Sequence, residues 1–251
     1  SAGWSYKWGV QQQRSQHRID LLDINYLYMP SIDQRFKEDY LEKDENYILK
    51  YNYEDRFIVR TGYSYIYNSA GKALMNNSGI GNSYTIRFNF ESAGNLLYAV
   101  AKLGGMKKNA SGEYTLLNIP FAQYLKGDFD FAKNLVIDNR NSLAFHFGVG
   151  IAIPYGNATM LPFEKRYFSG GANSVRGWSV RDLGPGSFPG DNNFMNQSGD
   201  IKLDASIEYR TRLFWKFRGA LFVDAGNIWT IRDYKDQPGG QFKFDKFYKQ
   251  I

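Results

Sequence analysis

The sequence contains no cysteine, which excludes disulfides, cysteine-ligated zinc and thiol catalysis. It has no apolar run of about 18 residues, so no transmembrane helix is expected. It also has no block of about five or more basic residues, although the net charge is +6. We therefore expect no nucleic-acid partner. No constellation of residues indicates a metal site or a cofactor, and we expect neither.

What the chain does contain favours extended structure. Aromatic residues make up 17% of the sequence, and there are 25 glycines but only 7 prolines. Apolar and polar residues alternate with a period of two, as in a strand with two different faces. The pattern predicts eight strands, at residues 3–10, 18–28, 47–67, 82–92, 119–133, 141–154, 200–213 and 217–229.

The two faces of these strands favour a membrane barrel. In the 141–154 strand one face carries Leu143, Phe145, Phe147, Val149, Ile151 and Ile153. The opposite face carries small and polar residues, as the lumen of an outer-membrane barrel does, and the apolar faces are long enough for a lipid-facing band of about 25 Å. The mean hydropathy of −0.49 does not contradict this, because only one face is apolar. A soluble β-sandwich also alternates and remains the alternative.

The connections between the predicted strands alternate between short and long. Outer-membrane barrels have short periplasmic turns and long external loops. The longest connection, residues 155–199, is too long to be an idle link in a compact domain. The rule therefore predicts that 155–199 is an external loop.

Two motifs single out isolated charges. FEKRYFSGGANSVRGW places Arg176 in a loop rich in glycine, serine and asparagine, and FVDAG places Asp224 in an otherwise apolar strand. A charge in such a strand needs a partner or a polar cavity. The period of two places Asp224 on the same face as Glu208 of the preceding strand, together with Phe222, which we expect to pack beneath the loop.

These motifs resemble those of the BamA/TamA superfamily of outer-membrane assembly and translocation barrels, also called bacterial surface antigen barrels. GGANSVRGW is similar to the family's loop signature, and DASIEYR and FVDAGNIW to its next two strands. The resemblance implies an all-β antiparallel transmembrane barrel in the outer membrane of a Gram-negative bacterium, with the long loop folded into the lumen. It assigns the functional motif to Val175, Arg176, Gly177 and Trp178, and the lumenal acidic partners to Asp224 and Glu208. Trp178 replaces the commoner phenylalanine or tyrosine.

The resemblance also implies that the chain is part of a larger barrel. Residues 1–251 would form about eight strands of a single barrel domain of about sixteen, without the POTRA domains and without the terminal strands that form the lateral seam. A lumen of eight strands is too narrow for both a long loop and many charged side chains. We therefore expect an open, curved sheet with unpaired edges near Trp4 and Trp229.

The function that the resemblance implies is not enzymatic. The barrel would assist insertion, assembly or translocation of proteins through bilayer thinning and lateral opening beside the seam. Its partners would be outer-membrane lipids, unfolded outer-membrane or secreted proteins, and periplasmic or inner-membrane proteins bound through POTRA domains. A passive or substrate-specific channel and a two-partner-type secretion transporter remain alternatives.

Two further residue pairs raise other chemistries. Ser142 and His146 share a strand face, as a hydrolase nucleophile and base would, but they lie about 13 Å apart. Asp128 and Asp130 also share a face and are compatible with a cation site. We expect these carboxylates to pair instead with Lys126 or a neighbouring arginine.

Overall fold

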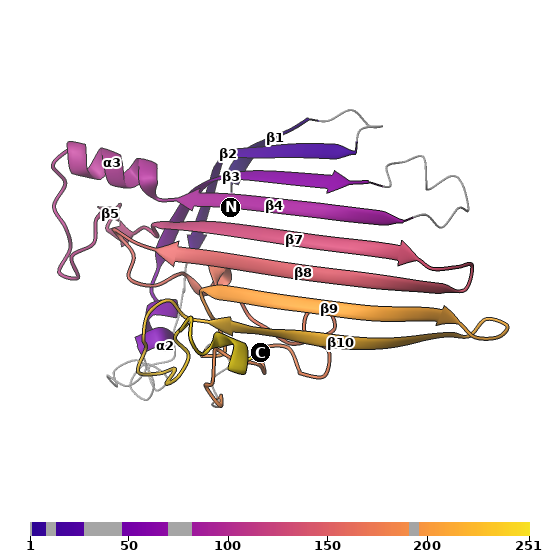
Figure 1. Ribbon diagram of the computed structural model, residues 1–251. Coiled ribbons are helices and arrows are strands. Elements are labelled where there is room, and N and C mark those ends of the chain that lie inside the picture. The colour runs from indigo at the N-terminus through magenta and orange to yellow at the C-terminus, as the bar shows by residue number, and fades with distance from the viewer. Residues whose placement is uncertain (1, 9–13, 28–46, 70–81, 191–195) are drawn as a thin grey trace.

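The computed structural model describes residues 2–8, 14–27, 47–69, 82–190 and 196–251, and it contains one large antiparallel sheet (Figure 1). The strands of this sheet are β1 (Ala2–Trp8), β2 (Ser15–Leu27), β3 (Arg56–Asn68), β4 (Ser83–Ala93), β7 (Tyr124–Val136), β8 (Asn141–Pro154), β9 (Ile201–Arg212) and β10 (Arg218–Trp229). The smaller elements are α2 (Tyr47–Asn52), α3 (Asn95–Leu103), β5 (Thr115–Leu116), β6 (Ile119–Pro120) and the 3₁₀ turns η3 (Phe163–Lys165) and η4 (Phe247–Lys249).

The sheet follows the order of the chain, β1-β2-β3-β4-β7-β8-β9-β10, and every neighbouring pair is antiparallel. Strands β1 and β10 occupy its two edges and are not paired with each other in the described part of the chain. The predicted all-β, antiparallel class is confirmed, and so is the open sheet. Predicted residues 9, 10 and 28 lie outside the described residues.

The expected strand at 47–67 is wrong in its first part. Residues 47–52 form helix α2, and strand β3 begins only at Arg56. Ile48 and Tyr51 lie one helical turn apart, and both pack against Met160 and Tyr234. Contacts with distant residues therefore determine that this segment is helical, although its aromatic composition suggests a strand.

The expected strand at 119–133 also begins later than its sequence pattern suggests. Ile119 and Pro120 pair with Thr115 and Leu116 in the small β5–β6 hairpin. The two residues between these strands have positive φ, 51° and 65°, as a tight hairpin turn requires. The long strand β7 starts only at Tyr124.

Helix α3 lies in the connection after β4. Gly94 precedes the helix with φ of 73°, and a Cβ atom there would lie 2.2 Å from the carbonyl oxygen of Ala122. Only glycine fits both the left-handed backbone and this close approach. Within the described residues, no helix is long and apolar enough to cross a membrane.

The sheet has an apolar face and a polar face, as the period of two predicts. On the apolar face the side chains are uncovered: Val149 is 37% exposed, Ile207 52% and Val223 72%. On the polar face, residues of the 155–190 segment contact β4, β7, β9 and β10. A soluble sandwich would cover its apolar face, so the arrangement is the opposite of that alternative.

The two ends of the sheet differ. The turns at 137–140 and 213–217 lie at one end, which we call the turn end, and helices α2 and α3 lie at the other, the loop end (Figure 1). A small apolar core fills the polar face near the loop end. Its buried residues are Ile58, Ala93, Ala122, Tyr124, Ala152, Leu161, Tyr167 and Ile228. This core interrupts the polar face near the loop end, where Arg56 of β3 also forms ion pairs with Glu54 and Glu113.

Candidate functional site

Glycines shape the backbone that presents Arg176. Gly170 and Gly171 have φ of 95° and 88°, and Gly177 has φ of 121°. A Cβ atom on Gly170 would lie 2.1 Å from the carbonyl oxygen of Ser179, so the chain can double back only with glycine at that position. The amide of Gly171 donates to the carbonyl oxygen of Trp178 at 2.8 Å, which closes the reversal.

Arg176 sits at the tip of this reversal and reaches both predicted carboxylates. Its Nε and Nη2 atoms each donate to one oxygen of Asp224 at 2.7 Å, and its backbone amide donates to the same carboxylate at 3.0 Å. Its Nη1 atom forms an ion pair with Glu208. The guanidinium thus forms the bidentate, charge-assisted contact to which its planar fork is suited.

Strand register explains why these groups meet. Phe222 of β10 lies directly opposite Glu208 of β9, and Asp224 follows two residues later on the same face. The guanidinium carbon of Arg176 lies 3.7 Å from the centre of the Phe222 ring. The aromatic residue on the polar face therefore serves as a platform beneath the arginine, as expected from its parity.

The charges of the cluster balance. Asp224 is almost fully buried, with 4% of its side chain exposed, whereas Arg176 is 27% exposed. Glu208 is shared with Arg210, whose Nε donates to it at 2.6 Å. Hydrogen bonds from Arg176 to Asp224 and Glu208 raise the pKa of the guanidinium further above its usual range. The arginine remains charged at any physiological pH.

The other two motif residues have different surroundings. Val175 is buried, with 8% of its surface exposed, whereas Trp178 is half exposed. Gly177 lies between them in a conformation that side chains rarely adopt. Val175 and Gly177 thus have a structural reason, whereas no buried contact among the described residues requires tryptophan at 178.

A second contact region lies ten residues earlier in the same segment, and sequence reasoning missed it. Lys165 forms an ion pair with Glu91 of β4 at 2.7 Å, and the Tyr167 hydroxyl donates to Asp128 of β7 at 2.6 Å. Burial raises the pKa of Tyr167, and the neighbouring Asp128 carboxylate raises it further. The available signal was Gly150, where a Cβ atom would lie 2.6 Å from the Tyr167 ring.

Arg166, between these two residues, points the other way because the chain is extended there. Its guanidinium is fully buried, lies 3.6 Å from Asp200, and donates to the carbonyl oxygen of Ser198 at 3.1 Å and to Gln237 at 3.3 Å. Burial raises the pKa of Asp200. The 165–167 segment therefore links the sheet on one side to the C-terminal residues on the other.

The histidine and the two aspartates that raised a hydrolase or a cation site in the sequence are hydrogen-bonded to other side chains in the structure. His146 contacts Asp130 at 2.8 Å and Asp204 at 3.4 Å, so its ring is held by carboxylates. Asp128 bonds to Tyr167, and Asp130 to His146. The expected pairing of these aspartates with Lys126 or an arginine is thus wrong, because the inserted segment and the next strand supply nearer donors. No group of acidic or histidine residues suited to a metal occurs in the part of the chain that the structure describes.

Comparison with known proteins identifies the family of this fold and loop. The Omp85 superfamily domain matches residues 1–244. The chain belongs to the Omp85 superfamily. One curated Omp85 relative, the "Outer membrane protein assembly factor BamA" of Neisseria meningitidis serogroup B (strain ATCC BAA-335 / MC58), is 33% identical over 97 residues. That match covers 35% of this chain and 12% of the relative.

A solved Omp85 structure is also similar. It is "The crystal structure of BamA from Haemophilus ducreyi lacking POTRA domains 1-3", with 14% identity and a TM-score of 0.37, and the match covers 91% of this chain and 49% of that one. The chain thus spans about half of that structure and a smaller part of the curated relative. The suspected resemblance is confirmed, and membership of this family supports the predicted localisation in the outer membrane of a Gram-negative bacterium.

Proposed function

We propose that this chain forms part of a non-enzymatic transmembrane barrel of about sixteen strands that inserts or translocates unfolded proteins at the outer membrane. The single observation that carries the proposal is the contact of Arg176 with Asp224 and Glu208, at the tip of a loop that crosses the polar face of an Omp85 sheet. The polar face is the lumenal wall in this proposal, and residues 155–199, of which 191–195 lie outside the described residues, are the inserted loop.

The uncovered apolar face supports the membrane part of the proposal. Side chains such as Ile207 and Val223 are more than half exposed, and they match a face turned to lipid. In lipid, the unpaired backbone groups of the edge strands β1 and β10 need partners. Further strands of the same barrel supply them, and the edges at a seam can pair with an incoming strand.

The inserted loop acts as a brace in this mechanism. Arg176 holds it to β9 and β10, and Lys165 and Tyr167 hold it to β4 and β7. A wall fixed at two places keeps its curvature while a seam elsewhere opens. POTRA domains of the kind named for the Haemophilus ducreyi relative are the proposed route to periplasmic or inner-membrane partners.

The test is a reconstitution of the full-length protein in lipid vesicles. An unfolded outer-membrane barrel protein is added, and its folding is followed by protection from protease. We expect Arg176→Gln to slow this assisted folding strongly, whereas Lys246→Gln, an exposed charge change elsewhere, leaves it unchanged. Assisted folding that is identical in the Arg176 variant would refute the role of the loop.

The same vesicles separate the alternative functions. A steady ion conductance without assisted folding would favour a channel, and export of a soluble secreted protein without barrel insertion would favour a secretion transporter. Either result replaces the insertion function while leaving the fold assignment intact.

A further inference from the structure

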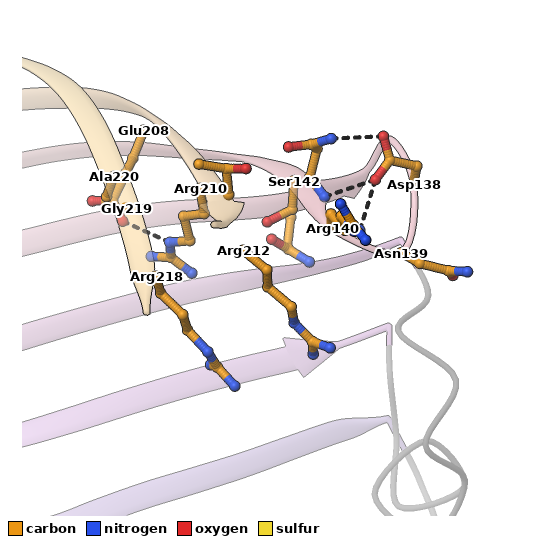
Figure 2. Close-up of a pocket in the computed structure, with 13 residues that line it drawn as sticks. Asp138, Asn139, Arg140, Ser142, Glu208, Arg210, Arg212, Arg218, Gly219 and Ala220 are labelled. Carbon is orange, nitrogen blue, oxygen red and sulfur yellow. Dashed lines mark hydrogen bonds and ion pairs between the residues drawn. The ribbon is translucent and has the colours of Figure 1, made fainter. Parts of the chain in front are cut away.

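A pocket of about 480 Å³ at the turn end is rich in arginine (Figure 2). It lies between the β7–β8 turn and the adjoining ends of β9 and β10. Its charged residues are Asp138, Arg140, Glu208, Arg210, Arg212 and Arg218. Four guanidinium groups therefore surround the pocket, against two carboxylates.

Strand register forces two of these arginines together. Arg212 of β9 lies directly opposite Arg218 of β10, and Figure 2 shows their side chains extending side by side away from the strands. Like charges directly opposite each other on one face destabilise a sheet. Arg140 is also close, because its carbonyl oxygen accepts a hydrogen bond from the amide of Arg212 at 2.9 Å.

The two carboxylates of the pocket are already engaged. Glu208 binds both Arg176 and Arg210. Asp138 accepts hydrogen bonds from the backbone amides of Arg140 and Asn141, at 2.6 and 2.9 Å, and thereby holds the turn. Within the described residues, no ion pair joins Arg140, Arg212 or Arg218 to an acidic side chain.

The described residues next to the pocket offer no compensation. The 213–217 turn contains no aspartate or glutamate, and Arg14, directly before β2, adds a positive charge. The β9–β10 turn adds Lys216. The turn end therefore carries an excess of positive charge, which attracts anions over a distance of about 10 Å at moderate salt.

We propose that this arginine pocket binds acidic segments of a polypeptide at the mouth of the barrel. Guanidinium groups bind carboxylates through two parallel hydrogen bonds, and paired arginines suit closely spaced aspartates or glutamates. The choice of polypeptide rests on the proposed function, because a protein that is inserted or translocated meets this mouth.

The alternative anion is a phospholipid headgroup, and the faces of the sheet argue against it. Arg210, Arg212 and Arg218 share the polar face with Asp224, whereas lipid contacts the opposite face in the proposed barrel. The exposed aromatic residues of the neighbouring turn, Trp215 and Phe217, suit the membrane interface. The pocket therefore lies near the level of the headgroups but opens toward the lumen.

The experiment measures peptide binding to the full-length protein in nanodiscs of zwitterionic phosphatidylcholine. The probes are a fluorescent peptide of about 12 residues that alternates aspartate with serine, and its counterpart with asparagine in place of aspartate. We expect the acidic peptide to bind about tenfold or more tightly than the neutral one, and its affinity to fall as salt is added.

Two double variants each remove two positive charges, so they have the same net charge as each other. R212Q/R218Q should weaken binding of the acidic peptide about tenfold or more, whereas K102Q/K107Q, two exposed lysines at the loop end, should change it less than about twofold. Equal binding of both peptides, or full binding by R212Q/R218Q, overturns the proposal. Binding of short-chain phosphatidylglycerol that depends on the two arginines, without binding of the acidic peptide, also overturns it in favour of a lipid.

The peptide assay tests the arginine pocket and the folding assay tests the proposed function, so each proposal can be refuted without the other. We expect Arg176→Gln to slow assisted folding strongly. The same change leaves Arg212 and Arg218 in place, so we expect it to retain peptide binding. Loss of peptide binding in R212Q/R218Q without any loss of assisted folding would support the pocket as a peptide site. Assisted folding that is unchanged in Arg176→Gln refutes the role of the loop alone, and a parent protein that gives no assisted folding refutes the proposed function alone.

Discussion

Replacing Asp224 with asparagine removes a negative charge from the centre of the Arg176 cluster with almost no change in shape. Asp224 accepts three hydrogen bonds from Arg176 and is 4% exposed, and the arginine is 27% exposed. Breaking a fully buried pair typically destabilises by about 3–5 kcal/mol, and breaking an exposed one by about 0–1 kcal/mol. Arg176 lies between these limits and retains Glu208, so we expect a loss of about 2 kcal/mol.

This loss should appear as local opening of the loop. About 2 kcal/mol corresponds to a rise of about 30-fold in the open population, because each 1.4 kcal/mol is a factor of about ten. Limited proteolysis within residues 167–183, or amide exchange of the Arg176 amide, reports this population when opening is faster than cleavage or exchange. Asp224→Asn should increase the rate by about that factor, and thermal unfolding of the sheet should change little.

The control is Asp245→Asn, an exposed carboxylate near the C-terminus, which should leave the rate unchanged. A double-mutant cycle with Arg176→Gln isolates the pair, and the two changes together should open the loop little more than either alone. The reasoning fails if the protease cleaves the Asp224→Asn protein at the parent rate, or if the effects of the two substitutions simply add. Either result would show that the Arg176–Asp224 pair does not hold the loop.

Three other changes test separate parts of the structure. Tyr167→Phe deletes the hydrogen bond to Asp128 and should lower the unfolding free energy by about 1 kcal/mol, measured by denaturant titration; an unchanged midpoint would show that this second contact contributes nothing. A spin label at Val149 should contact hydrocarbon and one at Ser206 should not, and the reverse pattern would assign the faces wrongly. Gly94→Ala meets a positive φ and a carbonyl oxygen at 2.2 Å, so it should lower the melting temperature clearly, and an unaltered transition would mean that the backbone relaxes there.

The strand pattern and the two faces could be predicted from the sequence alone. Alternation of apolar and polar residues is a local property of an extended chain, and it places Asp224, Phe222 and Glu208 on one face without any knowledge of the fold. The motif around Arg176 then indicates the family, and the parity of the strands indicates which carboxylates the arginine can reach. For these reasons the contact of Arg176 with both acids was predictable.

Only the tertiary structure showed where contacts between distant residues override the local sequence pattern or bring side chains together. Helix α2 forms where an aromatic-rich segment suggests a strand, because Ile48 and Tyr51 are buried in one cluster with Met160 and Tyr234. The contacts of Lys165 and Tyr167 with β4 and β7 depend on the path of a long loop, which periodicity does not determine. Likewise, Arg212 and Arg218 are distant from Arg140 along the chain, and only strand register gathers them into one pocket. Side-chain period is a local property, whereas loop path and register depend on contacts between remote parts of the chain.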